Sequence, residues 1–440
     1  MSFNGSYTQN PASRAGTGLG AADLLLGRPI NGQIRFLNGT RGFRRSELGF
    51  YVQDVYKVTE KLTLTMGLRF EDFLGWPWNE VTDRMYQFLP DQGTVARVGS
   101  AEVPWRSGIR GDHNNLSPRI GFAYRILEKT VFRGGYGLYY SVPQWDITRN
   151  LAANPPEFIV FAFTNNQFDF AGARPVSQGF DRPAQGEVQG TLRAIDIGSR
   201  TPYTQQWNAA IQHQLPKDLS LTIAYVGTRG LKLQGFPDIN AAIPGTGPVA
   251  ARRPWPQFDA ISAIQTRFNS IYHGLQVTAE RRFGRGLNFL AAYTYSHGID
   301  ENSQFGDVMD IRNIRLDRGN SDTDVRQRMV LSWTYELPFR VGGPARFLAN
   351  GWQINGILSL YDGLPLTINS SVNTLNIGRG TRADRLAHGA LPEDQRTIRR
   401  WFDTTAFAAP GAQMFGNAGR NILRGPGTKQ MDFSLFKAFY

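Results

Sequence analysis

Hydrophobic and polar residues alternate along much of this chain with a period of two, the pattern of a β-strand whose two faces differ. In residues 62–71, Leu62, Leu64, Met66, Leu68 and Phe70 alternate with polar or small residues. A similar run at residues 48–57 precedes it, and only a few polar residues separate the two. This arrangement predicts a β-hairpin.

The same unit of two alternating runs of about ten residues joined by a tight connection recurs along the chain. The further pairs fall at residues 120–140, 203–225, 275–295 and 325–360, and one more run spans residues 431–439. These runs amount to about eleven strands, with a weaker candidate near residues 34–37, and no segment keeps a helical period. The sequence therefore predicts an all-β fold.

Long polar segments separate the predicted hairpins, so that short and long connections alternate. The long ones are residues 72–115, 141–201, 228–267, 296–323 and 369–428. In an antiparallel meander, alternate connections lie at opposite ends of the sheet, so all tight turns share one rim and all long loops share the other.

This asymmetry is typical of outer-membrane barrels, which have short periplasmic turns, long external loops, an apolar outer face and a polar interior. The sequence predicts an antiparallel transmembrane β-barrel of this type, a partial barrel of about 11–12 strands with long extracellular loops. Its polar parity would line a wet lumen; examples are Arg69, Glu71, Arg119, Arg125 and Arg133. The alternative is a soluble sandwich, in which the apolar parity packs against a second sheet.

Composition narrows the class further. Hydrophobic residues make up 41% and charged residues 19% of the 440 residues, and Cys is absent. These values argue against a disordered polymer, and the missing Cys excludes disulfides, Cys-based metal sites and a cysteine nucleophile. No run approaches the roughly 18 apolar residues of a membrane-spanning helix. Residues 1–20 contain one basic residue, Arg14, and no apolar segment, so no signal peptide is predicted.

Several segments resemble, in the same order, the barrel strands of TonB-dependent outer-membrane receptors of the Oar-like class. They are GFYVQDVYKVTEKLTLTMGLRFE, LSPRIGFAYRI with TVFRGGYGLYY, TPYTQQWNAAIQHQLP, LSLTIAYVGTRG, YHGLQVTAERRF, AAYTYSHGIDE, DVRQRMVLSWTYELPF, ADLLLG and MDFSLFKAFY. The resemblance implies a barrel of about 22 strands, a lumen filled by a plug domain, and energy coupling through a TonB-type protein. This sequence has about half of those strands and no predicted plug domain or TonB box.

Candidate chemistry is sparse. The histidines His113, His213, His273, His297 and His388 lie far apart, without HExxH or another close pair, so no metal or cofactor is predicted. His297, Asp300 and Glu301 could imitate an acid–base or metal cluster, but a solvated loop is the favoured interpretation. Asp317, Asn320, Asp322 and Asp324 could hold calcium, although an acidic loop end is favoured there too.

Two further patterns lead to no site. The run Arg133, Gly134, Gly135, Tyr136 and Gly137 lacks the following helix that a phosphate loop needs. The net charge of +12 comes from dispersed residues, so nucleic-acid binding is not expected.

The functional hypothesis is an outer-membrane TonB-dependent receptor or transporter barrel, here as a fragment, located in the cell outer membrane of a Gram-negative-type bacterium. Residues 1–46 would be an N-terminal strand end and loop region, and residues 47–440 the barrel strands with short periplasmic turns and long external loops. No catalytic residue is predicted, and ligand-binding residues are not identified. Expected partners are outer-membrane lipid and lipopolysaccharide, an external ligand, and a TonB-type protein if a plug domain is supplied. The alternatives are a surface or adhesion barrel without transport, or a soluble all-β carbohydrate-binding protein.

Overall fold

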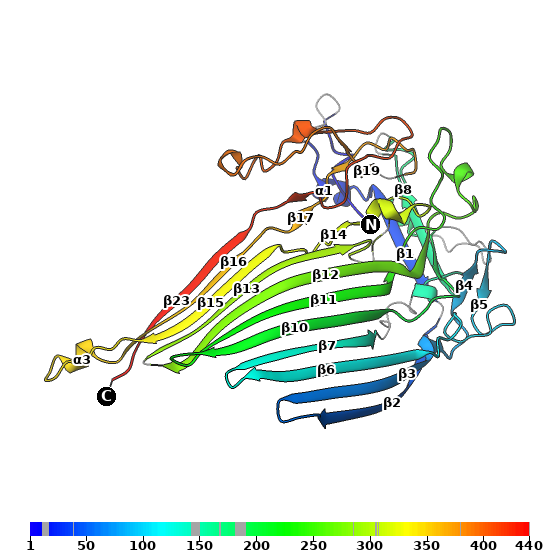
Figure 1. Cartoon of the computed structure of the whole chain (residues 1–440). Helices are drawn as coiled ribbons and strands as arrows, with labels where there is room; N and C mark the ends of the chain where they lie inside the picture. Colours follow the sequence, from blue (N-terminus) through cyan, green and yellow to red (C-terminus); the bar gives the residue numbers. More distant parts are fainter. Residues whose placement is uncertain are drawn as a thin grey trace.

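A continuous antiparallel sheet dominates the computed structural model, which describes residues 1–10, 17–37, 39–141, 150–166, 169–180, 191–284, 286–303, 306, 308–378 and 380–439. Eleven strands follow one another in chain order and curve into an open arc, which we call the wall (Figure 1). They are β2 (Phe43–Lys57), β3 (Leu62–Glu80), β6 (Asn115–Leu127), β7 (Thr130–Tyr140), β10 (Tyr203–Leu215), β11 (Leu219–Gly235), β12 (Ile261–Gly284), β13 (Leu287–Asp300), β15 (Gln327–Glu336), β16 (Trp352–Tyr361) and β23 (Thr428–Lys437).

The predicted separation of short and long connections is confirmed. Residues 58–61, 128–129 and 216–218 make short turns at one edge of the wall, the tight-turn rim. The short connection from β12 to β13 lies at the same rim, and Arg285 within it is outside the described residues. The connection from β15 to β16 at this rim is longer and contains α3 (Arg346–Ala349). All other connections lie at the opposite edge, the long-loop rim (Figure 1).

The wall has one apolar face on which many large side chains are exposed. Ladder register places Phe50 opposite Phe70 and Val52 opposite Leu68, so apolar residues of neighbouring strands share a face. Phe50 is 62% exposed, Val52 67% and Phe433 60%. The sandwich alternative is wrong, because it required this face to be buried against a second sheet.

The other face carries the polar parity. Arg69 forms an ion pair with Glu71 at 2.9 Å on the same strand, and the Arg119 guanidinium lies 4.5 Å from the ring centroid of Tyr139. These contacts let long charged side chains lie along the strands without burial. The predicted division into an apolar and a polar face is therefore confirmed.

The described ladders leave the wall open. β2 and β23 are its edges, and no ladder of the described residues joins them. Both strands run from the long-loop rim to the tight-turn rim, because an odd number of antiparallel strands ends as it begins. The expected count of about eleven strands is confirmed.

In two pairs of neighbouring wall strands, a glycine lies directly opposite a tryptophan. Trp207 is the register partner of Gly227, and Trp333 is the partner of Gly356. In each case a Cβ on the glycine would lie 2.2 Å from the indole. The missing side chain is what allows the ring to lie flat across the neighbouring strand, where it shields the backbone.

The structure departs from the sequence prediction at the long-loop rim. β3, β11 and β12 have 19, 17 and 24 residues, well beyond the roughly ten residues that a membrane crossing needs. The weak strand candidate near residues 34–37 is β1 (Asn31–Leu37). It pairs with β8 (Phe158–Thr164) outside the wall.

The remaining elements are short and lie mainly in the long connections. They are α1 (Gly20–Leu25), β4 (Tyr86–Leu89), β5 (Thr94–Arg97), β9 (Leu192–Ile195), β14 (Gly319–Asn320), β17 (Pro365–Leu366), β18 (Asn369–Ser370), β19 (Thr381–Arg382), β20 (Asp384–Arg385), β21 (Phe407–Ala408), β22 (Leu423–Arg424) and five single-turn 3-10 helices. Among the described residues, no helix is long and apolar enough to cross a membrane.

Candidate functional site

The long connections fold into a layer at the long-loop rim, which we call the cap (Figure 1). It comprises the described residues 1–42, 81–114, 150–201, 236–260, 301–326 and 362–427. Sequence analysis expected these connections to be polar loops. The structure instead places much of the molecule's buried apolar core in the cap and in the strand ends beneath it.

Two apolar clusters hold one side of the cap together. The first includes Met85, Val98, Ile109 and Leu151, each 0–1% exposed, and extends to Phe73 and Ile264 at the ends of β3 and β12. The second consists of Phe88, Leu192, Ala194, Phe258, Ile261 and Ala263. Apolar side chains from distant connections therefore fix the cap to the extended strands by ordinary hydrophobic burial.

Buried amide side chains complete the backbone hydrogen bonds of this region. Asn240 donates to the carbonyls of Trp255, Phe258 and Asp259 at 3.0, 3.0 and 2.6 Å, and accepts from the Trp255 N–H at 2.9 Å. Asn154 donates to the carbonyls of Tyr86 and Arg193 at 2.7 Å each. Such amides replace ladder bonds where the chain has no regular partner.

Three arginines dock the last long connection onto the ends of β13 and β15. Arg382 binds Asp317 at 3.1 Å between Nη1 and Oδ1, Arg420 pairs with Asp300, and Arg424 pairs with Asp324. We call these three arginines and three aspartates the clamp. Because each pair combines charge with hydrogen bonding, these are among the stronger contacts of the cap.

The backbone around the clamp strengthens it. Arg420 also donates to the carbonyls of Asp317 at 2.7 Å and Asp300 at 2.8 Å, and to the Ser303 hydroxyl at 3.0 Å. Beside it, the Asn421 amide donates to the Asn320 carbonyl at 2.7 Å and to Asp322 Oδ1 at 2.6 Å. The last connection is thus tied to residues 300–322 at many points.

The aspartates of the clamp are buried. Asp300, Asp317 and Asp324 are 5%, 7% and 4% exposed. Burial acts to raise the pKa of Asp324, but hydrogen bonds from the Gly298 N–H, Arg424 and His297 outweigh it and the pKa is lowered. Burial dominates at Asp317 and raises its pKa, even though the Met309 N–H and Arg382 oppose the rise. The expectation of a solvated loop is wrong for Asp300, and Asp317 and Asp324, which were expected to form an acidic loop end, are buried as well.

A hollow of about 340 Å³ lies beside the clamp. Arg382, Arg420, Asp317 and Asp322 line it, together with Glu301. Its walls therefore offer charged donors and acceptors at short range, which suits a polar ligand that carries both kinds of group. Both faces of the hollow come from connections at the long-loop rim.

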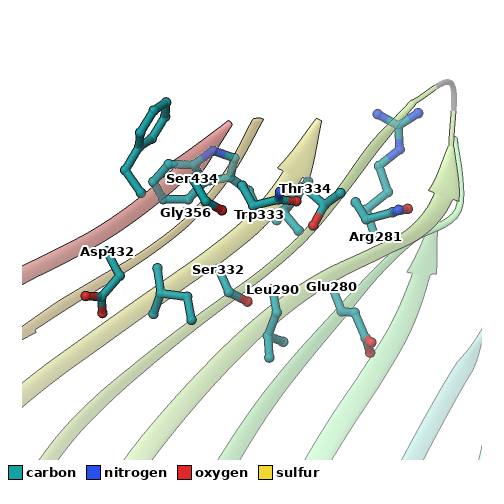
Figure 2. A pocket seen from close by; sticks show the side chains of 14 residues that line it. Glu280, Arg281, Leu290, Ser332, Trp333, Thr334, Gly356, Asp432 and Ser434 are labelled. Carbon is teal, nitrogen blue, oxygen red and sulfur yellow. The ribbon is translucent and has the colours of Figure 1, made fainter. Parts of the chain in front are cut away.

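A second hollow, of about 480 Å³, lies in the wall near the tight-turn rim. Ladder register aligns Glu280, Leu290, Ser332, Ile357 and Asp432 in one row across five strands. Figure 2 shows Glu280, Leu290, Ser332 and Asp432 pointing to the same side. Because three strands separate the two carboxylates, they cannot act as an acid–base pair.

The histidines do not come together as a cluster. Four of them form separate hydrogen bonds: His113 with Asp72 at 2.9 Å, His213 with Thr130 at 2.8 Å, His273 with Tyr225 at 2.7 Å and His297 with Asp324 at 3.2 Å. His388 is exposed. Within the described ranges, no three His, Asp or Glu side chains are placed to hold a metal ion.

The remaining candidates have structural roles. The glycine-rich run at residues 133–137 lies inside β7, so it forms a strand and not a phosphate loop. Glu301 accepts hydrogen bonds from the backbone and side chain of Asn269 at 2.9 and 3.2 Å. Sequence analysis missed the clamp, although the acidic run at residues 317–324 and the arginines of the last long segment were a usable signal.

One comparison with known proteins shows the family of this chain. The family model described as "Outer membrane beta barrel domain" matches residues 1–440. No curated protein matches the sequence.

The search of solved structures found weak similarity to bacterial outer-membrane proteins. One is the alcaligin outer membrane receptor FauA of Bordetella pertussis, with 15% identity, a TM-score of 0.37, and coverage of 73% of this chain and 38% of that one. Another is the ferripyoverdine receptor of Pseudomonas aeruginosa, with 13% identity, a TM-score of 0.41, and coverage of 74% and 30%. A third is the FrpB iron transporter of Neisseria meningitidis (F3-3 variant), with 11% identity, a TM-score of 0.41, and coverage of 83% and 38%. This chain spans less than half the length of each.

Proposed function

We propose a role for this chain from the premise that it belongs to the outer membrane β-barrel domain family and is a protein of the cell outer membrane. It supplies part of the barrel wall and the ligand-capturing external rim of a TonB-dependent receptor for a bulky substrate. In this role the apolar face of the wall meets lipid, the polar face meets the lumen, and the cap faces the outside. No covalent chemistry is involved.

The observation that carries this proposal is the ordered cap. Two apolar clusters, buried amides and the clamp fix long connections that come from five different places in the chain. When loops are already ordered in the free protein, less conformational entropy is lost on ligand binding. A rim built in this way, with a polar hollow beside the clamp, supports capture of a ligand from outside.

The open wall bears on how such a receptor would work. Among the described residues, β2 and β23 are unpaired on their outer edges, which supports a receptor in which further strands complete the barrel and a plug domain fills it. A TonB-type protein would then act on the plug and not on the wall. Within this scheme, residues 1–46 form the first external region, and residues 47–440 form the wall with its loops.

The proposed orientation is tested by single-cysteine labelling, which is clean because the chain has no native Cys. Asp394→Cys in the cap should react on intact cells with a membrane-impermeant maleimide, because this residue is exposed. Glu60→Cys, in an exposed turn of the tight-turn rim, is the matched control and should react only after the outer membrane is opened. The reverse pattern would show that the cap faces the periplasm and would overturn the proposal.

Transport is separated from adhesion by deleting the gene in the bacterium that carries it. If the chain serves uptake, the mutant should leave at least one large solute in the medium that wild-type cells remove, as measured by mass spectrometry. A protonophore should cause the same defect in wild-type cells. Unchanged solute removal together with lost surface attachment would favour an adhesion barrel.

A further inference from the structure

The connection between β15 and β16 exposes an unusual amount of apolar surface. Residues 338–348 are all exposed. Among them, Phe339 is 54%, Phe347 49% and Leu348 79% exposed, and Phe439, just beyond the adjacent β23, is 74% exposed. Turns at the rim of a barrel are normally short and polar, so a partner for this surface is expected.

This connection is nevertheless held in one shape. The Asn350 side chain closes it by accepting from the Val341 N–H at 2.8 Å and donating to the Val341 carbonyl at 2.9 Å. Lys437 donates to the Leu348 carbonyl at 3.2 Å, and the Trp352 indole N–H donates to the same carbonyl at 2.7 Å. The apolar side chains are therefore presented by a fixed backbone.

Trp352 and Lys437 also show on which side of the wall the connection between β15 and β16 lies. Trp352 and Lys437 are register partners, and Ile354 and Leu435 are the next pair on the same face. That face is the apolar one, which meets lipid in an outer-membrane barrel. Because Trp352 and Lys437 both bind the carbonyl end of α3, the connection leans over the lipid-facing side. Figure 1 shows α3 projecting beyond the ends of the strands.

Charge identifies the partner. Residues 337–351 contain two basic residues, Arg340 and Arg346, and no acidic one. Apolar side chains beside arginines, continuous with a lipid-facing surface, match the boundary between acyl chains and anionic phospholipid headgroups.

We propose that residues 338–348 are an interfacial anchor, which inserts Phe339, Phe347 and Leu348 into the periplasmic leaflet of the outer membrane and places Arg340 and Arg346 on phospholipid phosphates. Such an anchor fixes the depth of the wall at β15, β16 and β23.

The test places an environment-sensitive fluorophore at Leu348→Cys, with Glu60→Cys as the control at another turn of the same rim. The full chain is examined in outer-membrane fractions, and in vesicles of phosphatidylethanolamine and phosphatidylglycerol that contain spin-labelled lipid. We expect quenching by lipid labelled near the headgroup to be about threefold stronger at residue 348 than at residue 60. Arg340→Gln with Arg346→Gln should lower the ratio of shielded to exposed probe about tenfold in these anionic vesicles.

Two results would overturn the proposal. One is equal quenching of both positions by aqueous iodide, since it would place residue 348 in water. The other is shielding that develops only after a periplasmic protein extract is added, because the partner would then be a protein. Phe339→Ser with Phe347→Ser, made in the chain that carries the probe at Leu348→Cys, should remain in the membrane fraction, since the wall itself is retained, and should lose the stronger lipid quenching at residue 348.

Discussion

Replacing Arg420 with alanine should release the last long connection from the cap. Arg420 contacts five groups on residues 300–322: the carboxylate and carbonyl of Asp300, the carbonyl of Asp317, the hydroxyl of Ser303 and, at 3.5 Å, the carboxylate of Asp322. Its side chain is 12% exposed and that of Asp300 is 7% exposed. Removing the guanidinium therefore leaves a buried carboxylate without its cation.

The size of the effect follows from this burial. Breaking a buried ion pair by removing one partner costs about 3–5 kcal/mol, because the remaining charge stays desolvated. Since about 1.4 kcal/mol corresponds to a factor of ten, local opening of the connection should become about 10²- to 10³-fold more frequent. The wall should remain intact, because its ladders do not involve Arg420.

Hydrogen–deuterium exchange measures this opening directly. The amides of Asn421 and Gly425, which bind Thr367 and the Leu364 carbonyl, should exchange about 10²- to 10³-fold faster in the variant. Arg400→Ala is the control, because Arg400 is 62% exposed and lies 3.9 Å from Asp403 in an open pair. Equal exchange in the two variants would refute the argument that the clamp holds the cap.

Three further outcomes are expected. Asp324 has a lowered pKa in the folded protein, so its stabilising contribution is present above its unfolded pKa near 4 and is lost as the pH falls through its folded pKa. Hydrogen–deuterium exchange of the cap amides should accelerate in that pH range, and Asp324→Asn should weaken this acid dependence. Gly356→Val should destabilise the wall by about 1–3 kcal/mol by displacing the cross-strand indole. Gly67→Ala should have little effect, because a Cβ there would make only ordinary van der Waals contacts, the nearest at 3.7 Å; the heat-induced gel mobility shift measures both. Asn240→Ala should speed proteolysis of residues 236–260, by contrast with Gln257→Ala, which removes one exposed bond at 3.2 Å.

The wall could be predicted from sequence because its determinants are local. The alternation in residues 62–71 depends only on which side chains meet lipid or water, and the tight turns fix the register of neighbouring strands. The two rims followed from connection lengths alone. Strand ends were harder to predict, since β12 continues as a strand above the membrane for reasons that lie in the cap, where it pairs with β9.

The cap could not be predicted in the same way because its contacts are distant in sequence. The pairs Asp317 with Arg382, Asp300 with Arg420, and Asp324 with Arg424 join residues 65, 120 and 100 positions apart. From sequence alone, an acidic loop is interpreted as solvated, because the arginines that pair with it lie far away along the chain. Likewise, the strand near residues 34–37 could be predicted from the sequence, but its partner could not. That partner, β8, lies more than a hundred residues away in a segment without strong alternation of apolar and polar residues.

The direction of the two outermost strands limits how the wall can become a ring. Because β2 and β23 point the same way, joining them to each other would create a single parallel seam in an otherwise antiparallel ring. Two copies placed edge to edge in one bilayer would create two such seams. A fully antiparallel ring requires a complementary arc with an odd number of strands, whose first and last members both run from the tight-turn rim to the long-loop rim.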